Sequence, residues 1–463
     1  MRTPSFFLLG SLLLSSACAT TGAPPAPSPE SSAPERPFGT LREQAERQQA
    51  WLKERLEVAL PRLMRQHGVE MWVVPMREYN EDPVFKALVS ANSFAARRRT
   101  IFVFHDMGPE KGVVRLTLGG GAQGGLYEQR RPSRPADGAG SGRVIEPWGP
   151  EQWQMLKQVL EERQPKSIAI NVSRTFAFAD GLTHGEYEGM TEALGPTWTA
   201  RLKPSGGLPV DLLAWRTEDE ERFFAEENKL AWNIIETAFS NAVITPGVTR
   251  VQDVQWWMRQ RLGDLGLETW FHPSVSVQRQ GATDAQLGDN PVIQRGDVLH
   301  CDFGITALRL NTDTQHMGYV LREAEKDVPE GLKQALARSN RLQDLVVEEL
   351  RPGRTGNEVL RTVLERMRQE GINGTVYSHP VGLNGHGAGA IVGLWDRQEG
   401  VPGNGDHTII PSMWYSVELQ ATSPVAEWGG QPVRSAQEED VIIDAEGRVR
   451  WAWQRQTTFH LVR

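Results

Sequence analysis

Two aspartates, Asp302 and Asp313, lie in a stretch that otherwise reads as β-strand, HCDFGITALRLNTDTQ at residues 300–315. Strands usually exclude aspartate, so the two positions need an explanation. If the stretch forms an antiparallel hairpin that turns near Ala307 and Leu308, the odd separation places both carboxylates on one face of the sheet, opposite each other. Two carboxylates at that range repel each other unless a cation lies between them, and a divalent metal would supply the charge.

A second interpretation of the pair is an exposed turn. Asn311, Thr312 and Asp313 are residue types that form turns. Taken alone, the two aspartates favour the turn over the metal.

Further candidate ligands follow downstream. His379 and His386 lie in the glycine-rich segment SHPVGLNGHGAGA, and each alone is more typical of a structural histidine. Glu418 lies in the apolar strand MWYSVELQA, where a lone carboxylate is costly to bury. Glu438 precedes the apolar residues 441–443 and is expected at the start of that strand. Two aspartates, one histidine and two glutamates can bridge two divalent ions, and the oxygen-rich set suits Mn²⁺ or a similar metal.

The order of these residues resembles the pita-bread metallopeptidases, the family of methionine aminopeptidase, prolidase and Xaa-Pro aminopeptidase. The matching pieces are GDVLHCDFG with NTDTQ, SHPVGLNGHG, YSVELQ and QEEDVII, which span residues 296–443. A preceding α/β domain of this size resembles the amino-terminal domain of prolidases and Xaa-Pro aminopeptidases, which methionine aminopeptidases lack. The Xaa-Pro aminopeptidase branch is therefore the nearest.

The resemblance implies a site and a reaction. It implies hydrolysis of Xaa-Pro peptides by an aminopeptidase with two metal ions, Mn²⁺ first, with Co²⁺, Zn²⁺ or Fe²⁺ as alternatives. Glu418 would also be the general base, and His386 would contact the substrate and steady the tetrahedral intermediate. The implied metal ligands are Asp302, Asp313, His379, Glu418 and Glu438.

Three departures from the family pattern affect substrate specificity more than metal binding. The histidine expected about seventeen residues before the first aspartate is missing, and Ala285 and Gln286 lie near that position. His272 or His300 could substitute for it, although outer-shell support or packing fits either one better. Asn384 stands where an aspartate is common, and Ala436, with Arg434 nearby, replaces an arginine.

The amino terminus predicts export. Arg2, an apolar run from Phe6 to Leu14 and small residues before Cys18 form a signal layout, and the run is too short to span a bilayer. LLLSSAC resembles a bacterial lipoprotein signal, which implies lipidation at Cys18 and a place in the cell envelope facing the periplasm. Ordinary cleavage near Ala17 or Ala19, giving a secreted protein, is the alternative.

The elements that would position these residues indicate a smaller α/β domain followed by an α+β domain, and the resemblance implies that the second is a pita-bread catalytic domain. We expect an export signal at 1–18, a disordered Pro/Ala/Ser tether at 19–38, the α/β domain at 39–205 and the pita-bread domain at 206–463. Among the helices, one long pattern begins near Asp211 and stops at Pro246 and Gly247.

Composition limits the partners. The net charge of −8 and pI of about 5.8 argue against nucleic acid, and the membrane would be reached only through the lipid anchor. With Cys18 and Cys301 as its two cysteines, the chain has no disulfide framework, and Cys301 is expected to be a small buried residue. Relatives in this branch often form dimers or larger assemblies, so a homodimer is a candidate assembly beside the peptide substrate.

Two other functions stay open. The chain could be a non-catalytic metal- or peptide-binding lipoprotein on the same fold, which the missing histidine would permit. It could also follow the creatinase-like hydrolases, which share the fold without metals, but retention of all five ligand types argues against that.

Overall fold

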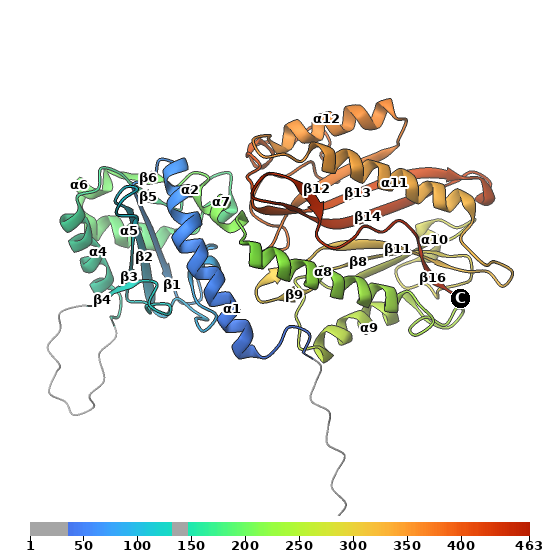
Figure 1. The fold of residues 1–463 in the computed structure, drawn as a ribbon, viewed down its shortest axis with the longest axis horizontal. Coiled ribbons are helices and arrows are strands. Elements are labelled where there is room, and N and C mark those ends of the chain that lie inside the picture. Colours follow the sequence, from blue (N-terminus) through green and yellow to red (C-terminus); the bar gives the residue numbers. More distant parts are fainter. Residues whose placement is uncertain (1–35, 132–146) are drawn as a thin grey trace, which may run out of the picture.

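A computed structural model describes residues 36–131 and 147–463, which form two domains lying side by side (Figure 1). The expected export signal, Cys18 and most of the tether lie outside the described residues. The fold prediction is confirmed: a mixed α/β sheet domain precedes a domain built on a curled antiparallel sheet.

The amino-terminal domain is a six-stranded mixed sheet with the order β4-β3-β2-β1-β5-β6. Its central strands β1 and β2 are almost fully buried, in keeping with the apolar runs MWVVPM and TIFVFH. The strands are β1 (Met71–Arg77), β2 (Arg99–Asp106), β3 (Val113–Leu118), β4 (Glu128–Arg130), β5 (Ile168–Ile170) and β6 (Leu202–Pro204). The helices are α3 (Phe85–Leu88), α4 (Pro150–Arg163), α5 (His184–Leu194) and α6 (Pro196–Thr199), with a 3-10 turn at Ala177–Ala179.

The first helical region joins this domain to the second. It runs through α1 (Leu41–Glu54), a π-helical turn (Arg55–Ala59) and α2 (Leu60–Gln66). Arg47 Nε and Trp51 Nε1 donate to Asp219 Oδ2 at 2.8 and 2.7 Å, and Arg55 pairs with buried Glu220. The start of α8 is thereby fixed against α1.

The long helical pattern after Asp211 is two helices, which corrects the prediction. α7 (Leu208–Ala214) ends before a short extended break, and α8 (Glu218–Ala238) ends eight residues before Pro246. Thr217 causes the break, because it forms a capping box with Glu220 and starts a new helix. The remaining helices are α9 (Val251–Asp264), α10 (Asp284–Leu287), α11 (Glu330–Glu349) and α12 (Gly356–Gln369).

The sheet of the second domain has the order β12-β13-β14-β11-β8-β7, and all these pairs are antiparallel. β15 pairs with β14, and β16 runs parallel to β11. The strands are β7 (Ser274–Gln278), β8 (Val298–Phe303), β11 (Thr314–Val320), β12 (Gly374–Val381), β13 (Met413–Val425), β14 (Gln431–Ile443), β15 (Val449–Trp451) and β16 (His460–Val462). Short 3-10 turns lie at Asn404–Asp406 and Ala426–Trp428.

Helices cover one face of this sheet, and the other face carries the polar residues. α11 and α12 pack on β12, β13 and β14, while α8 and α9 pack on β7 and β8 (Figure 1). Because side chains alternate along a strand, Val417 and Leu419 enter the helix-side core, whereas Glu418 faces the opposite side. Cys301 likewise lies in the core beneath α8 and α9, as a free buried thiol whose pKa burial raises.

The stretch between the two aspartates is a hairpin, with a register that differs from the prediction. β9 (Thr306–Ala307) and β10 (Leu310–Asn311) turn at Leu308 and Arg309, one residue later than expected. Asp302 therefore pairs with Gln315, and Asp313 is its diagonal neighbour on the same face. The aspartates share a face without lying directly opposite each other.

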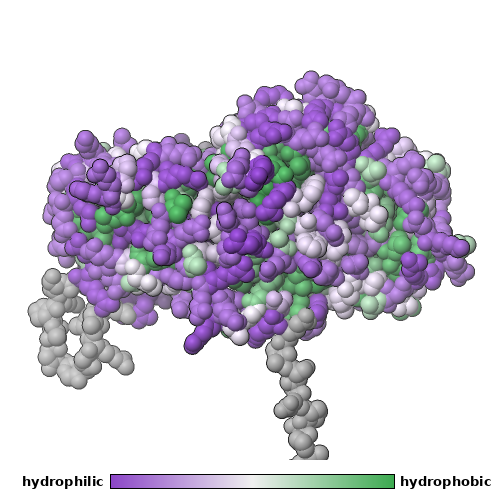
Figure 2. All heavy atoms as spheres, in the orientation of Figure 1, coloured by the Kyte–Doolittle hydropathy of each residue, from purple (hydrophilic) through white to green (hydrophobic). Residues whose placement is uncertain are grey.

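The surface in Figure 2 is mostly hydrophilic, with hydrophobic residues in separate smaller patches. Within residues 36–131 and 147–463, no helix has the length and apolar character needed to cross a membrane.

Candidate metal centre

The polar face of the second sheet brings the five predicted ligands together. β11 lies between β8 and β14, so Gln315 pairs with Asp302 on one side and with Glu438 on the other. Glu438 in turn pairs with Glu418 on β13. Glu438 lies eight residues into β14, so its predicted place at the start of a strand is wrong; the polar residues before it continue the same long hairpin strand.

Ligand atoms from these residues lie within 4.8 Å of one another in overlapping groups. Across the described part of the chain, three groups of this kind occur. They are Asp302 with Asp313 and Glu438, His379 with Glu418 and Glu438, and Asp313 with His379 and His386. Asp313, His379 and Glu438 each belong to two groups, and a shared carboxylate such as that of Glu438 could contact two ions.

His379 is oriented with one ring nitrogen toward the carboxylates. Its Nδ1 lies 2.9 Å from the carbonyl oxygen of Pro380, so Nδ1 carries the proton and donates it. Nε2 lies 3.5 Å from Asp313 Oδ2 and 3.4 Å from Glu438 Oε1. The backbone contact thus leaves Nε2 with a lone pair available to a metal.

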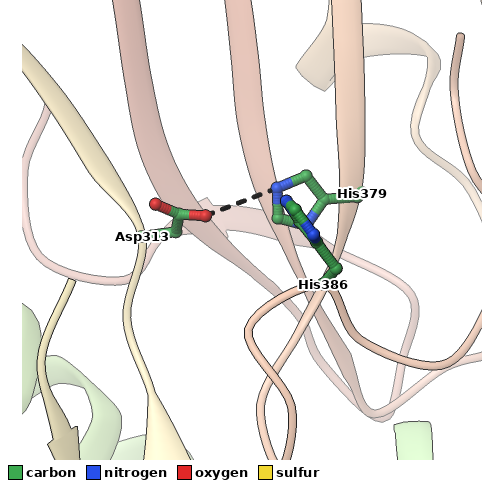
Figure 3. Close-up of side chains that lie close together, drawn as sticks. All are labelled: Asp313, His379 and His386. Atoms are coloured by element: carbon green, nitrogen blue, oxygen red, sulfur yellow. Dashed lines mark ion pairs between the residues drawn. The ribbon is translucent and has the colours of Figure 1, made fainter. Parts of the chain in front are cut away.

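Figure 3 shows Asp313 and His379 pointing toward each other, with His386 beside His379 on the loop that follows β12. The rings of His379 and His386 are 4.8 Å apart and perpendicular, and Trp270 packs on His386 at 5.1 Å. His386 keeps an edge open to solvent. Its partial desolvation, and then the neighbouring His379, lower its pKa. A neutral, accessible imidazole at the rim can contact a ligand.

The carboxylates resist ionisation in the absence of a cation. Burial and then the charge of Glu438 raise the pKa of Asp302 and Asp313 well above the usual value and that of Glu418 to about 9. Burial alone would lower the pKa of His379, but the charges of the neighbouring Glu438 and Glu418 raise it. The centre holds excess negative potential that a divalent cation would neutralise.

The unpaired atoms fit a metal. Asp302 Oδ1, Asp313 Oδ1 and His379 Nε2 are buried and make no hydrogen bond within the described residues. Buried polar atoms are normally paired, so orphaned atoms that converge on one place indicate a missing ligand. Carboxylate oxygens with one imidazole form a donor set for Mn²⁺, Co²⁺, Fe²⁺ or Zn²⁺. The residues present therefore fit divalent metal.

Three residues of the centre were not predicted from the sequence: Gln315, Ser416 and Asp440. Ser416 Oγ donates to Glu438 Oε1 at 2.6 Å, and Asp440 Oδ2 accepts from the backbone N–H of Asp313 at 3.1 Å. Each lies two positions from a predicted ligand along a strand, so the period of two would have placed all three on the ligand face.

The residues that depart from the family pattern lie as follows. Ala285 and Gln286 are exposed on α10, and His272 is exposed with its ring against Trp256, outside the three metal groups. His300 reaches the centre indirectly, because its Nε2 donates to Gln315 Oε1 at 2.9 Å. Asn384, at the rim, and Arg434 are exposed.

The comparisons with known proteins agree with this geometry. A family model described as metallopeptidase family M24 matches residues 226–445. The comparison with curated proteins gave no match.

Solved structures share the fold across both domains. An X-Pro aminopeptidase from Thermotoga maritima MSB8 gives a TM-score of 0.58 at 15% identity and covers 87% of this chain and 100% of that one. An Xaa-Pro dipeptidase from Bacillus anthracis gives 0.53 at 18% identity and covers 89% and 99%. The N-terminal domain of FACT complex subunit SPT16 from Cicer arietinum (chickpea) gives 0.57 at 10% identity and covers 90% and 99%.

Identities this low support the fold alone, while the family match coincides with the curled sheet that carries the candidate ligands. This carboxyl-terminal pita-bread domain, matched over residues 226–445, belongs to metallopeptidase family M24.

Proposed function

We propose that the protein is an exported, dinuclear metal-dependent aminopeptidase that removes the amino-terminal residue from Xaa-Pro peptides. One observation carries the proposal: donor atoms of five residues converge within 4.8 Å in groups that share Glu438, and three of those atoms are buried without a hydrogen bond. A family of metallopeptidases is the setting in which such a centre hydrolyses peptides.

Two overlapping groups of residues would hold the two metal ions. Asp302, Asp313 and Glu438 would hold one ion, and His379, Glu418 and Glu438 would hold the other. Bound divalent ions lower the pKa of a coordinated water and polarise a carbonyl group, which is the chemistry of hydrolysis.

The chain's own groups supply proton transfer and charge stabilisation. Glu418, ionised once cations offset its neighbours, accepts the proton of the attacking water. His386, neutral and open to solvent beside His379, donates a hydrogen bond to the scissile carbonyl oxygen as negative charge develops there.

Two structural neighbours support the Xaa-Pro part of the proposal, because one is an X-Pro aminopeptidase and the other an Xaa-Pro dipeptidase. Mn²⁺ is the metal we propose first, since four of the five donors are carboxylates.

A second candidate function is a metal- or peptide-binding lipoprotein without turnover. It is favoured by the exposed Ala285 and Gln286, which leave the family's upstream histidine position without an imidazole. This candidate keeps the metal site or the peptide pocket and differs from the enzyme in having no turnover.

The export part of the proposal concerns the first 38 residues. We propose that the signal at 1–18 directs the chain to the cell envelope and that lipidated Cys18 anchors it there through the Pro/Ala/Ser segment. Radiolabelled palmitate incorporated into the wild type and lost in Cys18→Ala would support the anchor. A soluble secreted wild type would contradict it.

The function is tested with the purified chain lacking residues 1–18. Metal content is measured first, and hydrolysis of Xaa-Pro peptides and of matched peptides without proline is then followed with and without Mn²⁺. The proposal expects two ions per chain, Mn²⁺-dependent release of the first residue, and loss of that activity in Glu418→Gln. Two ions with no turnover across the peptide panel would favour the binding protein, and absence of metal would reject both the enzyme and a metal-binding protein.

A further inference from the structure

Gln315 lies at the middle of the carboxylate cluster and contacts two of the proposed ligands. Its side-chain Nε2 donates to Glu418 Oε1 at 2.9 Å and to Glu438 Oε2 at 2.7 Å. Both amide protons are thus used on carboxylates. The strand register explains the position, because Gln315 on β11 is the direct partner of Glu438 on β14.

His300 determines which end of the Gln315 amide faces the glutamates. His300 Nε2 lies 2.9 Å from Gln315 Oε1, and its Nδ1 lies 3.4 Å from Ser276 Oγ. Because an amide oxygen can only accept a hydrogen bond, His300 Nε2 carries the proton and donates it, and the amide nitrogen is left to point at the two glutamates.

The hydrogen bonds of the Gln315 amide determine which carboxylate oxygens are already engaged. One oxygen of Glu418 and one of Glu438 are occupied by Gln315, while Glu438 Oε1 faces Ser416 Oγ at 2.6 Å and His379 Nε2 at 3.4 Å. Gln315 thereby holds one oxygen of each glutamate, and Ser416 holds the second oxygen of Glu438 beside His379. A neutral donor can do this without repelling a cation, which a lysine or arginine in the same place would do.

We propose that Gln315, oriented by His300, is a positioning residue that presets Glu418 and Glu438 for divalent metal. Outer-shell partners of metal ligands typically contribute about 10- to 100-fold in metal affinity. The inference rests on the metal-binding part of the proposed function and is independent of peptidase activity.

The test is metal binding by the purified protein, measured as Mn²⁺ affinity by titration calorimetry with no peptide present. Gln315→Ala is expected to weaken Mn²⁺ binding about 10- to 100-fold. His300→Ala is expected to weaken it less, and the double variant no more than Gln315→Ala alone, because His300 acts through Gln315. His300→Gln, which keeps an N–H donor, is expected to recover part of the affinity.

Matched controls are Gln369→Ala and His272→Ala, which remove an exposed glutamine and an exposed histidine. Circular dichroism in chelator verifies folding, and if Gln315→Ala does not fold, the two His300 variants carry the test.

Affinities equal to those of the controls would overturn the inference, as would a double variant whose loss is the product of the single losses. A wild type that binds no Mn²⁺ would overturn the proposed function as well, so the two failures are distinguishable.

Discussion

Glu418 and Glu438 are direct partners across β13 and β14, both on the ligand face of the curled sheet. Like charges opposite each other in a sheet are destabilising. The repulsion between the two carboxylates is offset by groups that bind both of them. These are the Gln315 amide and, in the proposed enzyme, metal. The stability of the domain should therefore depend on divalent cations.

Metal removal tests this dependence. Saturating Mn²⁺ is expected to raise the free energy of unfolding by about 2.7 kcal/mol at 100 times the dissociation constant, because the ion binds the folded chain alone. Glu438→Gln should abolish most of the gain, since Glu438 belongs to two metal groups. The measurement is thermal unfolding with Mn²⁺ or chelator, with exposed Glu365→Gln as control. Equal Mn²⁺ shifts in Glu438→Gln and the control would contradict the assignment.

Without metal, stability should fall as pH rises. The pKa of Glu418 is about 9 in the folded chain, against an ordinary value of 4.5, owing to burial and then the charge of Glu438. The unfolded chain therefore releases this proton first, and stability is lost as pH increases from about 4.5 to 9. Asp302 and Asp313 add to the same trend.

Glu418→Gln removes one of the titrating groups, so its unfolding free energy in chelator should decline less steeply over that pH range. Urea titrations at intervals from pH 5 to pH 9 measure the two slopes. Identical slopes for variant and wild type would show that Glu418 ionises in the folded chain as it does in the unfolded one.

The sequence predicted the ligand types and the two-domain fold better than it predicted the register. The predicted apolar strand around Glu418 is confirmed as part of β13, with Glu418 facing away from the core that holds Val417 and Leu419. The turn at Leu308 and Arg309 was misplaced because neither residue is a typical former of a positive-φ turn. Gln315 and Ser416 were not predicted because an uncharged polar side chain on a strand does not by itself indicate a metal centre. Their spacing of two from Asp313 and Glu418 becomes informative once those residues are taken as ligands.

Gly385 packs tightly against Trp270 at the rim of the metal centre, beside His386. A Cβ built on Gly385 would lie 2.2 Å from ring atoms of Trp270, whose ring also packs on His386. Gly385→Ala should displace Trp270 and with it His386, lowering turnover on peptides while leaving Mn²⁺ affinity near that of the wild type.

Gly263→Ala is the matched control, because its Cβ meets nothing within 4 Å and alanine favours the interior of α9. Steady-state kinetics and Mn²⁺ titration of both variants make the comparison. Unchanged turnover in Gly385→Ala would show that the position of His386 does not depend on Trp270.

Arg309 links the hairpin between the two aspartates to the amino-terminal domain. Its guanidinium donates to four backbone carbonyls of that domain, those of Lys86, Val89, Ser90 and Ser93, at 3.0 to 3.4 Å. Gln48 Nε2 donates to Leu308 O at 2.8 Å. Leu308 and Arg309 have φ values of 49° and 69°, so contacts with the other domain hold a turn that their side chains disfavour.

Arg309→Ala should therefore loosen the docking of the two domains. Loss of charged hydrogen bonds to four carbonyls is expected to cost on the order of 2–4 kcal/mol. Calorimetry should show one joint unfolding transition in both proteins, at a lower temperature in the variant, because the two domains also share a hydrophobic core. Arg259→Ala on the exposed side of α9 is the control and should unfold as the wild type does. A joint transition at an unchanged temperature in Arg309→Ala would mean that the shared hydrophobic core and the contacts of Arg47 and Arg55 with α8 hold the domains together without Arg309.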